Sequence, residues 1–300
     1  MHFIFNDEKI DSITTAGLVI RPDSKHLLPY YHVLKKALNK YGVTLFIAQN
    51  SAETLGIEGG ISREDMFEKS DILIAFGGDG TLLSLSRRSY HHDKPILGIN
   101  AGNLGFLTDV QLDEIESFID KIFLGEYRID NRMVLEVELH AATGVKKLIA
   151  LNDIVLSRPS ISGMINVDAY LTSADAGMSQ KHLNRYRGDG LIISTPTGST
   201  AYNLSAGGPI VFPLTEALIL TPICPHSLTE RPLVLPADFE VEFKSEDETI
   251  VVVDGQDIYN LKFFDSMIIK IASRPVRMIH RVERNYFDLL RQKLNWGSNC

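Results

Sequence analysis

The chain has 300 residues, of which 44% are hydrophobic and 23% charged, and its formal net charge is -8 at pH 7. This length predicts two domains, with one large domain as the alternative, and the apolar content is sufficient for packed cores. The acidic balance argues against a general nucleic-acid coat and against binding to an anionic membrane surface, because both favour basic proteins.

The number of cysteines and the sequence of the N-terminus indicate the cellular compartment of the protein. Cys224 and Cys300 are the only cysteines and lie far apart, so no disulfide framework is implied and a reducing compartment fits best. Residues 1–8 lack a basic region followed by a long apolar run, and no stretch reaches membrane-spanning length. We therefore expect a soluble, cytoplasmic protein.

The first part of the chain alternates between strand-like and helix-like segments. Apolar runs typical of buried strands are followed by segments with apolar residues at helical spacing. This alternation predicts an α/β domain with a Rossmann-like parallel sheet and helices on its faces. The expected strands are 16–20, 43–48, 71–76 and 95–99, and the expected helices are 27–38, 82–90 and 113–123.

Short strand candidates dominate from about residue 130 onward. We expect an α/β domain at 1–129 and a mainly β domain at 130–276. A helical pattern returns only at 286–294, within a tail at 277–300 that we expect to pack back on the first domain. The expected strands of the second domain are 134–139, 147–150, 154–156, 165–171, 191–194, 233–235, 240–243, 250–253 and 267–271.

A glycine turn, Gly77-Gly78-Asp79-Gly80, follows the third expected strand and opens a helix. Glycine lets the backbone approach a ligand closely, and the N–H groups at a helix start suit phosphate oxygens. A carboxylate in such a cradle would repel phosphate unless a metal intervenes or the carboxylate has a proton to remove. Asp79 is therefore the first candidate for a catalytic residue.

Two further polar segments follow strand candidates. The segment from Asn100 to Asp109 either offers backbone and amide donors to a ligand or is a strand-to-helix turn with Thr108 or Asp109 as the N-cap. Asn152-Asp153 either grips a sugar diol, with the amide donating and the carboxylate accepting, or is a turn pair between strands.

The densest run of small and polar residues extends from Arg187 to Pro209. Hydroxyls, glycines and backbone amides this closely spaced are poor core material, and long irregular loops are usually functional. Tyr202 could stack on a planar ring while its hydroxyl finds a partner. We expect a polar ligand cradle in this run.

The remaining candidates are weaker. Asp254-Gly255-Gln256 is typical of a hairpin turn, with ligand contact by Gln256 as the alternative, and His226 is a lone imidazole. No His/Cys spacing suggests a structural zinc site, and the sequence has neither a Gly-x-Ser-x-Gly elbow nor a Walker pattern.

In this order the segments resemble the NAD kinase family over residues 71–296. Gly-Gly-Asp-Gly alone also occurs in diacylglycerol kinases, sphingosine kinases and phosphofructokinases. The stretch Thr-Pro-Thr-Gly-Ser-Thr-Ala-Tyr at 195–202 is far more specific. The resemblance implies an α/β domain followed by a β-rich nucleotide-binding domain, with the site between them.

The resemblance also implies an activity and its site residues. The enzyme would phosphorylate the 2′-hydroxyl of the adenosine ribose of NAD to give NADP, with Asp79 as proton acceptor. ATP is the expected donor, with another nucleoside triphosphate or polyphosphate left open. A divalent metal, Mg²⁺ above all, is expected to bind mainly through phosphates and water, so we expect no metal-ligating side chain. Nucleotide binding falls to Asp79, Gly80, Asn152, Asp153, Arg187, Asp189, Thr200, Ala201, Tyr202, Ser205 and Gln256.

This chain departs from the family pattern at one position, and two alternative functions stay open. The family usually has Asn-Glu where this chain has Asn152-Asp153, so a hydroxyl contact by Asp153 needs a shifted backbone or a water. The partners implied are NAD, ATP and further copies of the chain, as a dimer or tetramer, and neither nucleic acid nor membrane. The alternatives are a lipid or sugar kinase that shares the glycine turn and a non-catalytic NADP-binding sensor.

Overall fold

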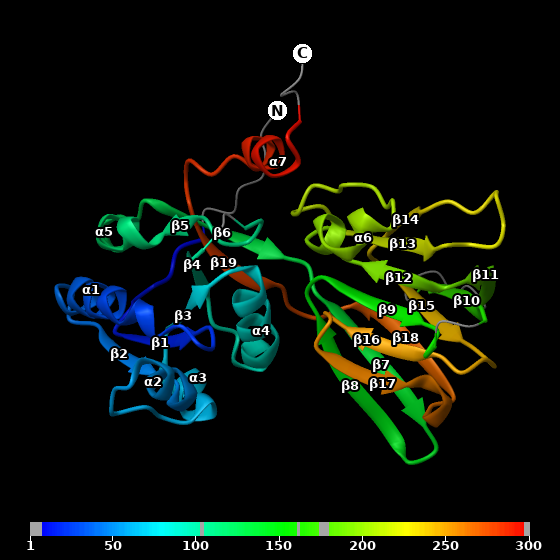
Figure 1. Cartoon of the computed structure of the whole chain (residues 1–300), viewed down its shortest axis with the longest axis horizontal. Coiled ribbons are helices and arrows are strands. Elements are labelled where there is room, and N and C mark those ends of the chain that lie inside the picture. The colour runs from blue at the N-terminus through cyan, green and yellow to red at the C-terminus, as the bar shows by residue number, and fades with distance from the viewer. Residues whose placement is uncertain (1–7, 103–104, 161–162, 174–179, 297–300) are drawn as a thin grey trace. The chain divides into compact units, whose positions relative to one another are not determined.

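The computed structural model describes residues 8–102, 105–160, 163–173 and 180–296. The chain divides into two compact units (Figure 1). Unit 1 comprises Met1–Asn131 and Val276–Cys300, and unit 2 comprises Arg132–Pro275. In the described part of the chain no helix is both long and apolar enough to cross a membrane.

Unit 1 is built on a sheet with the strand order β2-β1-β3-β4-β19-β6, in which β5 also pairs with β4. Strand β1 pairs in parallel with β2 and β3, and β4 pairs in parallel with β3, β5 and β19. The carboxyl ends of these strands therefore lie at one edge of the sheet. The strands are β1 (Thr15–Ile20), β2 (Thr44–Ile47), β3 (Ile72–Gly77), β4 (Ile96–Asn100), β5 (Val110–Gln111), β6 (Tyr127–Arg132) and β19 (Val276–Arg281).

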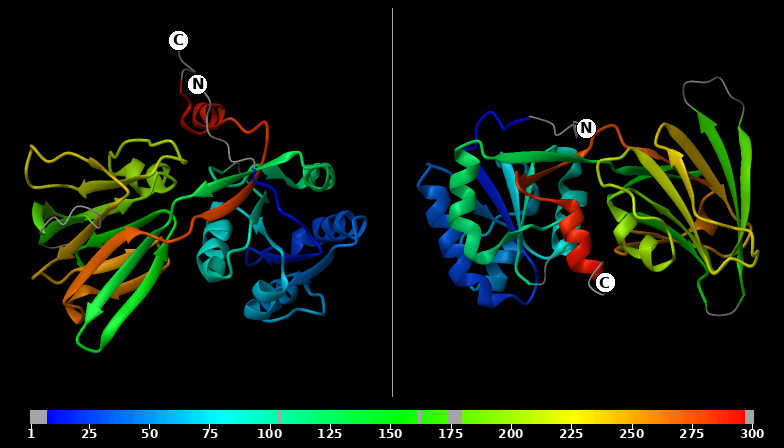
Figure 2. Two further views of the ribbon diagram at one scale, coloured as in Figure 1. Left: turned by 180° about the vertical axis from the view of Figure 1, so that it is seen from behind. Right: turned by 90° about the horizontal axis from the view of Figure 1, so that it is seen from above.

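Helices cover both faces of this sheet, which is why its central strands are apolar on both sides. Figure 2 shows α1 and α5 on one face and α4 on the other. Every residue of β3 is buried accordingly. The α-helices are α1 (Leu28–Asn39), α2 (Gln49–Leu55), α3 (Arg63–Lys69), α4 (Asp79–Ser89), α5 (Ile115–Phe123) and α7 (Tyr286–Leu294), and the 3₁₀ helices are η1 (Lys25–Leu27), η2 (Tyr90–His92) and η3 (Leu112–Glu114).

Unit 2 consists of two sheets whose apolar faces contribute to one buried core. One has the order β11-β10-β15-β18-β7-β8, and the other has the order β14-β13-β12-β9-β16-β17. The first comprises β7 (Leu135–Ala141), β8 (Gly144–Ala150), β10 (Ile165–Ser173), β11 (Lys181–Gly188), β15 (Phe239–Lys244) and β18 (Ser266–Ile271). The second comprises β9 (Asp153–Ser157), β12 (Gly190–Ser194), β13 (Ala217–Ile223), β14 (Leu233–Pro236), β16 (Ile250–Val253) and β17 (Asp257–Asn260), and the unit also holds η4 (Gly198–Thr200), α6 (Tyr202–Ser205) and η5 (Leu261–Phe263).

The predicted fold class is confirmed: an α/β unit with a parallel sheet is followed by a mainly β unit, and a helix lies near the C-terminus. The sequence analysis missed several elements, among them α2, α3, β6, β11, β13, β17 and β19. Strand β11 (Lys181–Gly188) shows the cause, because half of its residues are exposed and its polar sequence lacks the alternation expected of a strand.

Candidate functional site

The glycine turn lies at the carboxyl edge of the unit 1 sheet. Strand β3 ends at Gly77, Gly78 is the N-cap of α4, and Asp79 is the first residue of the helix. Because Gly78 has no side chain, no side-chain hydrogen bond caps α4. The first N–H groups of the helix are therefore available to an anion, as expected at the carboxyl ends of parallel strands.

The three glycines of the turn differ in what surrounds them. A Cβ atom added to Gly77 would lie 2.2 Å from Oγ1 of Thr81, so the packing of the turn itself requires glycine there. A Cβ atom added to Gly78 or Gly80 would have no described atom within 4 Å. At these two positions the absent side chain leaves open space, which is what close approach of a ligand to the backbone needs.

The Asp79 carboxylate is held by the backbone of the segment that follows β4. Its Oδ2 atom accepts a hydrogen bond from the Phe106 N–H at 2.6 Å. Its Oδ1 atom accepts from the N–H groups of Leu107 at 3.0 Å and Thr108 at 3.2 Å, and from the Thr108 hydroxyl at 3.4 Å. Since each oxygen has two lone pairs and Oδ2 accepts once from described residues, Oδ2 keeps a lone pair for a further proton.

The segment after β4 corrects one interpretation of the sequence. Neither Thr108 nor Asp109 caps a helix, because the backbone N–H of Thr108 is directed at Asp79 and the next helix, η3, begins at Leu112 with Gln111 as its N-cap. Backbone N–H groups of this segment donate to Asp79, so donation to a ligand stays a prediction, and Asn103, one of its two asparagines, lies outside the described residues.

A buried charge cluster lies behind this segment. The Arg284 side chain donates hydrogen bonds to the Phe106 carbonyl and to the ring of His280. The His280 ring lies 3.2 Å from Asp109 and 3.7 Å from Asp130. Burial, together with the positive charge of Arg284, lowers the pKa of His280 to about 4, so the ring is neutral near pH 7. The tail of the chain thus reaches the segment that holds Asp79.

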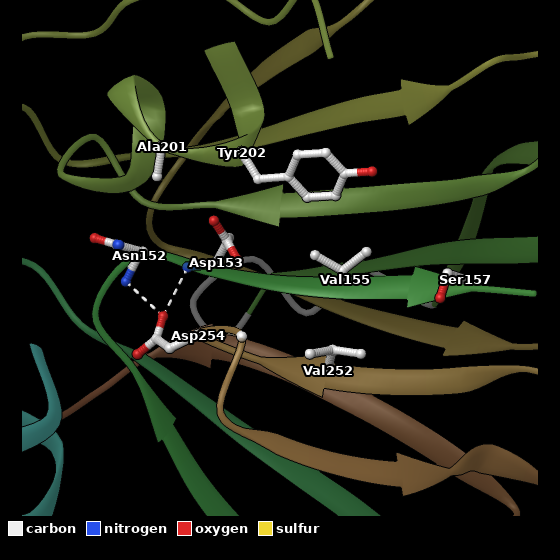
Figure 3. Close-up of a pocket in the computed structure, with 9 residues that line it drawn as sticks. Asn152, Asp153, Val155, Ser157, Ala201, Tyr202, Val252 and Asp254 are labelled. Atoms are coloured by element: carbon white, nitrogen blue, oxygen red, sulfur yellow. Dashed lines mark hydrogen bonds between the residues drawn. The ribbon is translucent and has the colours of Figure 1, made fainter. Parts of the chain in front are cut away.

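A pocket of about 480 Å³ lies in unit 2, on the outer face of the sheet that contains β9 and β16 (Figure 3). Its walls combine carboxylates, an amide and a hydroxyl with apolar side chains and one aromatic ring, as expected for a site that takes a small polar molecule. It is lined by Asn152, Asp153, Val155, Ser157, Ala201, Tyr202, Val252, Asp254 and Gly255.

The pocket brings together four of the predicted ligand residues: Asn152, Asp153, Ala201 and Tyr202. Tyr202 is 47% exposed at the start of α6, so its ring is available for stacking. The Asp153 carboxylate is buried, and burial together with the charge of Asp254 raises the pKa of Asp153 to about 7. A carboxyl group that changes charge near neutral pH is common at functional sites.

The other predicted residues of unit 2 do not line this pocket. Arg187 is exposed on β11, and Asp189 forms an ion pair with Arg158 at 2.9 Å. Thr200 lies at the end of η4, and Ser205 lies at the end of α6. Gln256 lies exposed in the turn between β16 and β17, which is the hairpin turn that Asp254-Gly255 predicted.

The polar residues upstream of Tyr202 hold the loop together. The Thr195 hydroxyl donates to the Leu151 carbonyl at 2.6 Å, and the Ser199 hydroxyl donates to the Pro196 carbonyl at 2.7 Å. Asn203 is buried and accepts a hydrogen bond from the Thr221 hydroxyl at 2.6 Å. The loop therefore uses much of its hydrogen-bonding capacity for its own shape and presents Ala201 and Tyr202 to the pocket.

Five lining residues were not predicted from the sequence as ligand residues: Val155, Ser157, Val252, Asp254 and Gly255. Strand periodicity could have found two of them. Since alternate residues of a strand share a face, Asp153 on the ligand face implies Val155 and Ser157 beside it. Val252 faces Val155 across the antiparallel pair β9–β16, a register that the sequence does not reveal.

Comparisons with known proteins agree along the whole chain. The model of the ATP-NAD kinase N-terminal domain matches residues 16–127, and that of the ATP-NAD kinase C-terminal domain matches residues 151–281. NAD kinases of Sulfurimonas denitrificans and Wolinella succinogenes are 46% and 45% identical, each over 97% of this chain and 99% and 98% of their own.

Solved structures give the same result. Yeast NADH kinase complexed with NADH aligns with a TM-score of 0.84 and 25% identity, over 97% of this chain and 90% of its own. An NAD kinase from Archaeoglobus fulgidus in complex with ATP aligns with a TM-score of 0.73 and 26% identity, over 94% of this chain and 98% of its own. These matches do not favour a lipid or sugar kinase or a non-catalytic sensor.

Proposed function

The chain belongs to the NAD kinase family, and from that membership we propose that it transfers the γ-phosphoryl group of ATP to the 2′-hydroxyl of the adenosine ribose of NAD. The observation that carries this proposal is the Asp79 carboxylate, which backbone N–H groups fix beside an open glycine turn.

In the proposed reaction Asp79 is the proton acceptor. The ribose 2′-oxygen forms a bond to the γ-phosphorus while the bond from that phosphorus to the β,γ-bridging oxygen breaks, and ADP leaves. The hydroxyl proton moves to Oδ2 of Asp79, the oxygen that accepts one hydrogen bond from the described residues. Because four hydrogen bonds restrict the carboxylate, little reorientation is needed during transfer.

The triphosphate is proposed to bind at the start of α4. The open space over Gly78 and Gly80 and the N–H groups at the start of α4, which no side chain of its N-cap residue Gly78 caps, support this placement. Among the described residues no group of three or more His, Cys, Asp or Glu could hold a metal ion. A Mg²⁺ ion would be held mainly by phosphate oxygens and water, as is usual for this ion, and would neutralise charge on the transferred group.

The unit 2 pocket is proposed to hold part of NAD. Asn152 and Asp153 can donate to and accept from sugar hydroxyls, and Tyr202 can stack on a planar ring. The residues predicted to assist are Gly80, Arg187, Asp189, Thr200, Ala201, Ser205 and Gln256. We further propose that the enzyme works in the cytoplasm and that it forms a dimer or tetramer. Light scattering coupled to size-exclusion chromatography can test the oligomeric state.

The Asp79→Asn variant tests the proton-acceptor role. We expect it to remain folded, with a lowered melting temperature because its NH₂ group would face one of the N–H donors, and to keep its calorimetric affinity for NAD, while kcat falls about 10²–10⁴-fold, the usual contribution of a general base. The wild-type enzyme is first assayed in a matrix of ATP, other triphosphates and polyphosphate against NAD, NADH, sphingosine and fructose 6-phosphate. NADP formation from NAD and ATP is the expected result, and near-normal turnover of the variant would remove Asp79 from this role.

A further inference from the structure

We propose that Asp254 is a positioning residue for NAD binding: its carboxylate fixes the backbone of residues 151–153 and so presents the Asn152 and Asp153 side chains to the dinucleotide. This inference rests on the function proposed for the unit 2 pocket. It gives a role to Asp254, for which the sequence indicated only a place in a hairpin turn.

Asp254 contacts three successive residues of this segment, and Figure 3 draws its hydrogen bonds with Asn152 and Asp153. Oδ2 of Asp254 accepts from the Leu151 N–H at 2.8 Å, and Oδ1 accepts from the N–H groups of Asn152 at 2.8 Å and Asp153 at 2.9 Å. In return the Asp254 N–H donates to the Asp153 carbonyl at 2.9 Å. Three successive N–H groups thus converge on one buried carboxylate.

The carbonyl side of the same segment is held by β12 and the loop after it. The Thr195 N–H donates to the Asn152 carbonyl at 2.9 Å, and the Ser194 hydroxyl donates to it at 3.2 Å. A Cβ atom added to Gly198 would lie 2.1 Å from the same carbonyl oxygen. The N–H groups of this segment are therefore held by Asp254, and the Asn152 carbonyl is held by β12 and the loop after it. These contacts on both sides restrict the movement of its backbone.

The chemistry of the site explains why the residue is an aspartate. A carboxylate offers two acceptor oxygens, whereas an asparagine would turn an NH₂ group toward one of the N–H donors. Asp254 also has a φ of +49°, a left-handed conformation that a non-glycine residue adopts at a cost. A glycine would relieve this conformation but would lose all three hydrogen bonds. The hydrogen bonds of the carboxylate therefore offset the cost of the left-handed backbone.

A second consequence of the arrangement provides a readout. The Asp153 carboxylate is close enough for the negative charge of Asp254 to contribute to its raised pKa, after burial. Sugar hydroxyls donate best to an ionised Asp153. The affinity of the wild-type enzyme for NAD should therefore rise as pH increases through about 7.

The test compares Asp254→Asn with Asp247→Asn in the full-length enzyme. Asp247 is a matched control, because its carboxylate also accepts from a backbone N–H in unit 2, that of Asn166 at 2.7 Å, and it does not line the pocket. Calorimetry with NAD at pH 6, 7 and 8 should show about tenfold weaker binding by Asp254→Asn and unchanged binding by Asp247→Asn. The inflection of affinity with pH should also move to lower pH only in Asp254→Asn.

Two outcomes would overturn the inference. One is normal NAD affinity of a folded Asp254→Asn enzyme, and the other is an equal loss in both variants. If Asp254→Asn does not fold, Ser194→Ala removes the hydroxyl that donates to the Asn152 carbonyl, leaves the Thr195 N–H in place, and should weaken NAD binding while the melting temperature still shows a folded protein. A wild-type enzyme that binds no NAD would instead contradict the proposed function, so the two failures are distinguishable.

Discussion

At the scale of single residues, the structure separates positions that the sequence makes look alike. Gly77 is required by contact with Thr81, whereas Gly78 and Gly80 border open space. The sequence predicted a glycine turn with a carboxylate in it, but the two kinds of glycine differ only in their three-dimensional neighbours. Likewise Asp153 and Asp254 each lie next to an apolar strand and both line the pocket, but only the fold shows that the Asp254 carboxylate also accepts hydrogen bonds from backbone N–H groups.

Gly105 offers a test of how Asp79 is positioned. A Cβ atom at Gly105 would lie 1.9 Å from Oδ1 of Asp79, so Gly105→Ala should push the carboxylate aside, weaken its hydrogen bonds to the segment after β4 and lower the melting temperature. We expect kcat to fall about 10²-fold with NAD affinity unchanged, because a shift of about 1 Å in a catalytic group has this effect.

Gly102→Ala is the matched control for this prediction. Its added Cβ atom would meet only Nη1 of Arg21, at 3.6 Å, which is an ordinary contact. Steady-state kinetics and thermal melts of both variants check the prediction. Equal kcat values for the two variants would show that crowding at Gly105 does not reach the reacting groups.

At the scale of elements, the apolar pattern predicted some elements and missed others, among them the buried strand β13 (Ala217–Ile223). The buried strand β3 and the helix α7 were predicted, whereas β19 (Val276–Arg281) was not, because Arg277, His280 and Arg281 break its apolar run. Those polar residues are used elsewhere: Arg281 pairs with Glu114 at 2.6 Å, and His280 belongs to the buried cluster. Sequence alone cannot show such partners, since they lie more than 100 positions away in the chain.

Arg284, just beyond β19, connects this element to the segment that holds Asp79. Its guanidinium group spans the Phe106 carbonyl, His280 and two carboxylates, which a single ammonium group cannot do. We expect Arg284→Lys to lower kcat about tenfold or more while NAD affinity is retained, because the variant keeps the charge and loses the link to Phe106.

Arg281→Lys is the comparison for Arg284→Lys. It also loses a two-pronged contact of a guanidinium group, in this case with Glu114 on the surface of unit 1, and its side chain has no hydrogen bond to the segment after β4 in the described structure. Kinetic constants and melting temperatures are measured for both. A similar fall in kcat in the two variants would assign the effect to general destabilisation of unit 1.

At the scale of the whole molecule, the two units carry buried titratable groups with opposite effects on stability. In unit 1 the pKa of His280 is about 4 in the folded state and 6.5 ordinarily, so between these values only the unfolded chain binds the proton. In unit 2 the pKa of Asp153 is about 7 in the folded state and 3.8 ordinarily, so between these values only the folded unit binds the proton. Unit 1 therefore loses stability from His280 as pH falls below 6.5, and unit 2 gains stability from Asp153 as pH falls below 7.

Hydrogen exchange resolved by residue should show this divergence directly. Between pH 7.5 and pH 5.5 each group contributes on the order of 1–2 kcal/mol. Protection factors, corrected for the intrinsic exchange rate, should fall in β3 and β4 of unit 1 and rise in β9 and β12 of unit 2. His280→Gln should flatten the first trend and Asp153→Asn the second, each without altering the other. Parallel trends in the two units would mean that neither buried group controls stability in this range. A rise confined to unit 2 would also mean that Asp153 is maintained at a cost to folding, as expected of a carboxylate whose use is to bind a ligand.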